Sequence, residues 1–199
     1  MGAFDERSKS VKKRLMILLF VLVLLIGCTK EAPVDEHPEW NAYPVRFGNV
    51  LAAETIDGFT LNETNDVMSI AGLWYATWTA GEGTEIRNAQ GKNAKVYDAQ
   101  VYLLLKEGQT EKGTEADVND WIKREAEAYE TTETTVTVNG RQYRVLHLLS
   151  SGDGNPYHHG EAAFLQFGAN AVTVEVLVRE DFSGSTEEIL MQFLSKLHY

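Results

Sequence analysis

The chain has few cysteines and few basic residues. Cys28 is the single cysteine among 199 residues, which excludes an intramolecular disulfide and leaves the fold to be held by a hydrophobic core. Lysine and arginine number 18 against 29 aspartates and glutamates, so the formal net charge is −11. An acidic protein repels phosphate backbones and anionic lipid surfaces, and this composition therefore argues against nucleic acid as a partner.

The chain also lacks an apolar run long enough to span a bilayer. Residues 15–26 are uninterruptedly apolar, but a transmembrane helix needs about 20 such residues. The basic residues 12–14 before this run and the small Gly27 after it are typical of a secretion signal. An N-myristoylation site at Gly2 is disfavoured, because that motif requires Ser or Thr where this chain has Glu6.

The end of the apolar run resembles the lipobox of bacterial lipoproteins, with the sequence Leu25-Ile26-Gly27-Cys28. The resemblance implies a palmitate-containing lipid on the Cys28 thiol and cleavage between Gly27 and Cys28. The mature protein would then be anchored by lipid to the outer face of the cytoplasmic membrane, in the cell envelope. Removal of residues 1–27 would shift the formal net charge to −14. Thr29 is not the Asp of the inner-membrane retention signal, so a single- or double-membrane host stays open.

The remaining chain divides into a tether and one domain. Residues 28–44 are rich in acidic residues and proline and show no apolar periodicity, so we expect a flexible acidic tether. Residues 45–199 have the length of a single globular domain and contain no internal repeat. We predict an α+β fold, with an antiparallel β-sheet flanked by two main helices near residues 116–129 and 186–197.

The strand predictions rest on alternation and turn signals. Trp74, Ala76 and Trp78 lie on one face of a strand over residues 73–79. The dipeptide Asn139-Gly140 is a type I′ hairpin signal between two further strands. The other predicted strands cover residues 96–105, 134–138, 142–149, 162–167 and 172–178.

The helix predictions rest on capping signals and apolar stripes. Thr114 and Asp117 approximate a capping box before the first helix, and Ser185 with Glu188 forms one before the second. The apolar stripe of the first helix includes Val118, Trp121, Ile122 and Tyr129, and that of the second includes Ile189, Leu190, Phe193, Leu194 and Leu197.

The order of elements from residue 96 to 199 resembles the later half of the Mog1/PsbP-like domains. It runs strand, helix, hairpin, strand, strand and terminal helix. The resemblance implies an antiparallel sheet flanked by helices, and several members of that group are lipoproteins. It rests on topology and hydrophobic pattern, so it implies no role for any particular residue.

The most ligand-like cluster is His158 and His159 with Asp153 and Glu161 nearby. Imidazole and carboxylate ligands suit zinc, copper or nickel. Both rings reach one metal only if the loop curls, because adjacent residues on a strand point to opposite faces. Residues 153–156 are more simply interpreted as a turn, since they supply the backbone geometry that a turn needs, and a metal site is the alternative.

The sequence contains no recognisable catalytic motif. There is no G-x-S-x-G or S-x-x-K in a supporting context and no H-E-x-x-H. His147 lies within a predicted strand, which favours a half-buried structural histidine over a catalytic base. We therefore assign no catalytic residue and no cofactor, and expect a binding or accessory module for an envelope protein or a small ligand. The alternative is an extracytoplasmic metal-binding protein or hydrolase built on His147, His158 and His159.

Several aromatic residues leave a second question open. Trp74, Tyr75 and Trp78, with Tyr97 and Tyr102, either form part of the core or line a groove for a sugar or peptide. Because alternate residues of a strand face opposite sides of a sheet, the face of residues 73–79 that is left uncovered decides between these interpretations.

Overall fold

The computed structural model describes residues 34–65, 72–87, 93–150 and 156–199. The chain divides into two units, residues 1–36 and 37–199, and the elements given below belong to the second unit. The expected signal peptide, Gly27, Cys28 and Asp153 lie outside the described residues.

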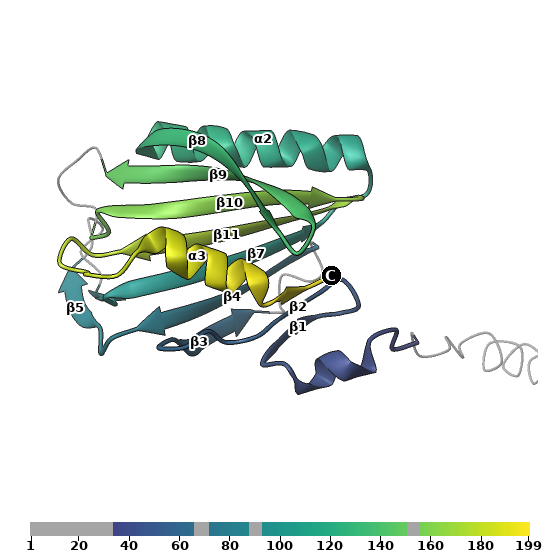
Figure 1. Ribbon diagram of the computed structural model, residues 1–199, viewed down its shortest axis with the longest axis horizontal. Coiled ribbons are helices and arrows are strands. Elements are labelled where there is room, and N and C mark those ends of the chain that lie inside the picture. The colour runs from purple at the N-terminus through teal and green to yellow at the C-terminus, as the bar shows by residue number, and fades with distance from the viewer. Residues whose placement is uncertain (1–33, 66–71, 88–92, 151–155) are drawn as a thin grey trace, which may run out of the picture. The chain divides into compact units, whose positions relative to one another are not determined.

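Seven strands form one antiparallel sheet, in the order β3-β4-β7-β11-β10-β9-β8 (Figure 1). This confirms the predicted α+β class with an antiparallel sheet. The strands are β3 (Thr60–Asn65), β4 (Leu73–Ala80), β7 (Ala99–Glu107), β8 (Tyr129–Val138), β9 (Arg141–Ser150), β10 (His159–Phe167) and β11 (Asn170–Val178).

Smaller elements accompany this sheet. A three-stranded sheet contains β1 (Val45–Phe47), β2 (Leu51–Ala53) and β12 (Leu197–His198). A separate hairpin contains β5 (Thr84–Arg87) and β6 (Asn93–Val96). The strand predicted over residues 96–105 is thus interrupted at Tyr97 and Asp98, and its apolar part belongs to β7.

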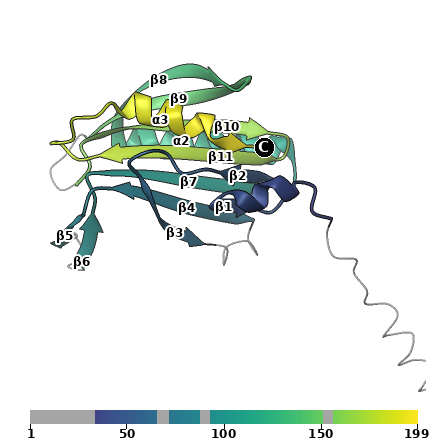
Figure 2. The ribbon, with the colours of Figure 1, turned by 60° about the horizontal axis from the view of Figure 1, so that its bottom comes forward.

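Two helices cover the large sheet, α2 (Glu111–Ala128) and α3 (Thr186–Ser195) (Figures 1 and 2). Helix α3 lies on the face that presents Trp78, whose ring meets that of Phe193 edge-on at a centroid distance of 4.8 Å. Helix α2 packs on the other face, where Val118 contacts a separate cluster that includes Phe164. None of the helices in the described part of the chain has the length and hydropathy needed to span a membrane.

The hairpin prediction at Asn139-Gly140 is confirmed. Both residues have positive φ, 51° and 75°, as a type I′ turn requires, and the flanking Val138 and Arg141 are paired. Strand β8 is longer than the predicted residues 134–138, because it begins at Tyr129, directly after α2. The periodicity of the helix stripe conceals this boundary, since Tyr129 packs beside the same apolar cluster as the helix.

The capping prediction is right for one helix and wrong for the other. The Ser185 hydroxyl accepts a hydrogen bond from the Glu188 amide at 3.2 Å, which confirms the start of α3. Helix α2 is capped by Thr110 instead of Thr114, and therefore begins before residue 116. The Thr114 hydroxyl donates instead to the Thr110 and Ala169 carbonyl oxygens, so it ties the first turn of α2 to the start of β11.

Ordered structure begins before residue 45, where we expected the domain to start. Pro38–Ala42 form a 3-10 helix, η1, in which Trp40 is 4% exposed and stacks on His37 at a centroid distance of 3.9 Å. Tyr43 likewise stacks on His198 of β12 at 4.4 Å. Isolated aromatic residues without periodicity carry these contacts, so the pattern of the sequence did not reveal them.

Candidate functional site

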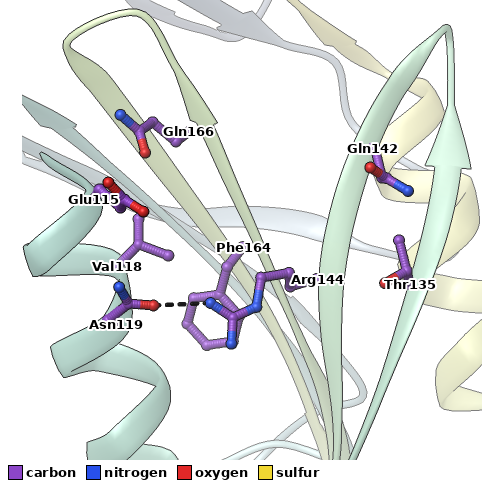
Figure 3. Close-up of a pocket in the computed structure, with 8 residues that line it drawn as sticks. All are labelled: Glu115, Val118, Asn119, Thr135, Gln142, Arg144, Phe164 and Gln166. Atoms are coloured by element: carbon purple, nitrogen blue, oxygen red, sulfur yellow. Dashed lines mark hydrogen bonds between the residues drawn. The ribbon is translucent and has the colours of Figure 1, made fainter. Parts of the chain in front are cut away.

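A pocket of about 340 Å³ lies between α2 and strands β8 to β10 (Figure 3). This volume is within the range of small-molecule sites, roughly 300–1,000 Å³. The lining residues are Glu115, Val118 and Asn119 of α2, Thr135 of β8, Gln142 and Arg144 of β9, and Phe164 and Gln166 of β10.

Arg144 crosses the pocket and is held at two points. Its Nη1 donates to Oδ1 of Asn119 at 2.9 Å (Figure 3). Its Nε donates to Oε1 of Glu133 at 2.7 Å. The hydrogen bond from Arg144 lowers the pKa of Glu133, which therefore stays ionised as a fixed partner. The guanidinium is thereby oriented by groups from α2 and β8 before any ligand arrives.

Several polar groups of the pocket remain available. The side chains of Glu115, Thr135 and Gln142 have no hydrogen-bond partner among the described residues. The Gln166 amide nitrogen donates to the carbonyl oxygens of Glu111 and Gly168, which leaves its amide oxygen as an acceptor. These carboxylate, hydroxyl and amide groups suit the binding of a ligand by hydrogen bonds.

The aromatic residues divide between the two faces of the sheet. Trp78 is fully buried on the α3 face, and Trp74 packs beside Phe47 of β1 at a centroid distance of 5.7 Å. The core interpretation holds for these tryptophans. Tyr75 and Tyr102 instead lie on the opposite face, partly exposed, with their rings stacked at 5.7 Å. Tyr97 lies outside the strands, and its hydroxyl donates a hydrogen bond to Oδ1 of Asn62 at 3.4 Å.

The register of β9 and β10 places His147 and His159 on the same face, with Glu161 directly opposite His147, whereas His158 precedes β10. Nδ1 of His147 lies 2.7 Å from Oε1 of Glu161 on the neighbouring strand, and the Thr186 hydroxyl lies 3.4 Å from the same oxygen. His158 instead faces Glu180 at 3.7 Å, and His159 begins β10. Burial raises the pKa of Glu161, against the lowering effect of His147. Within the described ranges, no group of three or more metal-ligating side chains is arranged to hold a metal ion.

Sequence reasoning missed one further acidic residue. Glu175 lies on β11 at the centre of the sheet, paired with Tyr102 of β7 on one side and Ala162 of β10 on the other. Burial, and then the charge of Glu125 on α2, raises the pKa of Glu175 to about 7. The alternation of valine with Thr173 and Glu175 is typical of an antiparallel strand with one face in water, so the pattern conceals the burial of Glu175.

Neither a protein-family model nor a curated protein matches this chain. Among solved structures, a protein from Bacteroides thetaiotaomicron VPI-5482 is similar with 10% identity and a TM-score of 0.44, and the match covers 74% of this chain. The match spans less than half of that protein, 44%. PsbP (CyanoP) from Synechocystis sp. PCC 6803 is similar with 12% identity and a TM-score of 0.38, over 78% of this chain and 98% of that one. At TM-scores below 0.5, these likenesses assign no function.

Proposed function

We propose that this protein is a lipid-anchored, extracytoplasmic binding module whose ligand occupies the pocket between α2 and strands β8 to β10. The observation that carries the proposal is the set of polar groups in that pocket that are not used by the fold. The leader sequence and Cys28 support the location, since they match a lipoprotein signal.

The charges of the pocket favour a small, neutral, polar ligand. Its one cation, Arg144, already faces Glu133, and Glu115 adds a second carboxylate, so an anionic ligand meets more negative than positive charge. Amide and hydroxyl groups from Gln142, Thr135 and neighbouring residues both donate and accept hydrogen bonds. This combination suits the hydroxyl and amide groups of a sugar ring or a short peptide.

The pocket can be blocked by one substitution. Thr135→Phe places an aromatic ring in the lining from an exposed position on the edge strand β8, where aromatic residues are well tolerated. Thr134→Phe makes the same change on the opposite face of β8 and is the matched control.

Saturation-transfer NMR on the full chain in detergent, with glucose, N-acetylglucosamine and glycylglycine as probes, tests this pair of variants. We expect transfer to at least one probe in the wild type and in Thr134→Phe, and its loss in Thr135→Phe. Equal transfer in all three proteins, or none in the wild type, contradicts the assignment of this pocket.

The lipid anchor is tested separately at Cys28. Cells fed a palmitate analogue should label the wild-type protein, and mass spectrometry should find a diacylglyceryl thioether on an N-terminal Cys28. Cys28→Ala should abolish the label and leave the precursor uncleaved. An intact Met1 on the membrane-bound protein would overturn this part of the proposal.

A further inference from the structure

Among the described residues, no helix packs on one half of one face of the large sheet, away from the pocket described above. On the α3 face, the small sheet extends the cover over β4, where Phe47 packs against Trp74. On the other face, α2 packs on β8, β9, β10 and β11. Tyr75 of β4 and Tyr102 of β7 remain partly exposed beside it.

A single cross-strand row runs through this open half. Glu63 of β3 pairs with Thr77 of β4, Thr77 pairs with Tyr102 of β7, and Tyr102 pairs with Glu175 of β11. Because neighbouring strands lie about 4.8 Å apart, the Cα atoms of the two glutamates are separated by roughly 14 Å. The row therefore has a carboxylate at each end and a tyrosine between them.

The carboxylate at the β11 end has no cation of its own. Glu175 forms no hydrogen bond or ion pair with the described residues, and its charged neighbour across the face is the acidic Glu125 of α2. Lys106, on the same face of β7, is already bound by Asp117 of α2 at 2.5 Å. The surface thus holds negative charge that the fold does not neutralise.

A buried hydroxyl in the row also lacks a partner. Thr77 is 6% exposed, and its Oγ1 has no hydrogen-bond partner among the described residues; the same is true of the buried Oγ1 of Thr173 on this face. Strand alternation places Thr77 on the face of Tyr75 and Tyr102. An unpaired buried hydroxyl is unfavourable, and a hydrogen-bond donor from a ligand would offset that cost.

We propose that this open face binds a linear aliphatic polyamine lying across the strands. One terminal ammonium binds Glu63, the other binds Glu175 beside Glu125, and the methylene chain lies on the rings of Tyr75 and Tyr102. Tyrosine faces attract ammonium groups within about 6 Å of the ring centroid, which adds to the carboxylate contacts. The Thr77 hydroxyl accepts a hydrogen bond from an amine between the two ends.

A metal ion fits this surface less well than a chain cation. The carboxylates at the two ends of the row are too far apart to share one ion, and no metal-binding group of three residues was found within the described ranges. Two ammonium groups joined by a flexible apolar chain match both the separation of the carboxylates and the aromatic surface between them.

The test is isothermal titration of the full chain in detergent with spermidine as the probe. We expect saturable binding with about one spermidine per protein, weaker binding of the shorter diamine putrescine, and little displacement by Mg²⁺ at the same ionic strength. Glu175→Gln should weaken spermidine binding about tenfold, because it removes a partly buried charge partner. It should not unfold the protein, since the neutral amide keeps the shape of the side chain.

Glu188→Gln, in the exposed first turn of α3, is the matched control, because it removes one negative charge from the other face of the sheet. Spermidine binding should be unchanged in that variant. A second variant, Tyr102→Leu, should weaken binding by removing the ring. Absence of spermidine binding, an equal loss in Glu175→Gln and Glu188→Gln, or full displacement by Mg²⁺ would each overturn the proposal.

Discussion

Glu175 makes the stability of the fold depend on pH. Burial raises its pKa from 4.5 to about 7 in the folded protein, so the folded state binds its proton more tightly than the unfolded chain does. This contribution is fully present below about pH 4.5 and is lost as the pH rises through 7. At about 1.4 kcal/mol per pKa unit, the free energy of unfolding should fall by at most about 3 kcal/mol across this window.

Other carboxylates do not reverse this trend. Burial raises the pKa of Glu125 and of Glu161 as well, so both act in the same direction as Glu175. Hydrogen bonds from their cationic partners lower the pKa of Glu54 and Glu133, and their contributions are lost only as the pH falls below about 4.5. Urea unfolding between pH 5 and 8.5 therefore separates the effect of the buried carboxylates from that of Glu54 and Glu133.

The variant Glu175→Gln assigns the effect to one residue. We expect its unfolding free energy to approach that of the wild type near pH 5, where Glu175 is protonated in the folded state, and to exceed it by up to about 3 kcal/mol at pH 8.5. Glu188→Gln, with the same change of charge at an exposed position, should follow the wild-type curve. Parallel curves for Glu175→Gln and wild type between pH 5 and 8.5 would refute the reasoning, because they would show that Glu175 is solvated and ionised throughout.

Two further pairs of substitutions test the two layers of the core and two glycine positions by urea unfolding at pH 7. Phe193→Ala should lower the unfolding free energy by about 3–5 kcal/mol, because the Phe193 side chain of α3 is fully buried against Trp78. Trp121→Ala should lower the unfolding free energy by less than Phe193→Ala does, because Trp121 is only partly buried beside its cluster. An equal loss would show that the Trp121 side chain is more fully buried. Gly160→Ala should destabilise more than Gly140→Ala, because an added Cβ at 160 meets the backbone of β11, whereas at 140 it meets open space and costs only the strain of positive φ, about 1 kcal/mol.

The elements that the sequence predicts correctly are those with strong local signals. Positive φ at Asn139 and Gly140 fixes the β8–β9 hairpin. The alternation over residues 73–79 predicts strand β4, although it leaves open which face of that strand is covered. The start of α2 was misplaced because Thr110 and Thr114 lie one turn apart and both suit a cap. Which threonine caps the helix depends on the tertiary contact of Thr114 with Ala169, and that contact is invisible to local patterns.

The candidate sites depend on register, which composition does not encode. Arg144 meets Asn119 and Glu133 from two other elements, and Tyr102 meets Glu175 through the pairing of β7 with β11. Sequence analysis can mark each residue as a polar interruption of an apolar pattern. It cannot pair residues that lie tens of positions apart, because a shift of one residue in register turns every side chain to the other face. His158 and His159 are neighbours in sequence, yet the fold gives them different positions: His158 lies 3.7 Å from Glu180, and His159 begins β10.

The last prediction concerns the N-terminal edge of the domain, where Trp40 is nearly as buried as Phe193 but far less central. Trp40 is held by a short 3-10 helix and by its stack on His37, so the segment can detach without opening the sheet. We therefore expect Trp40→Ala to cost less unfolding free energy than Phe193→Ala and to increase proteolytic cleavage near residues 38–42 at low denaturant. If Trp40→Ala instead lowers global stability as much as Phe193→Ala does, with no local cleavage, then η1 unfolds together with the core. Residues 37–44 would in that case belong to the cooperative domain itself, which would shorten the tether proposed to follow Cys28.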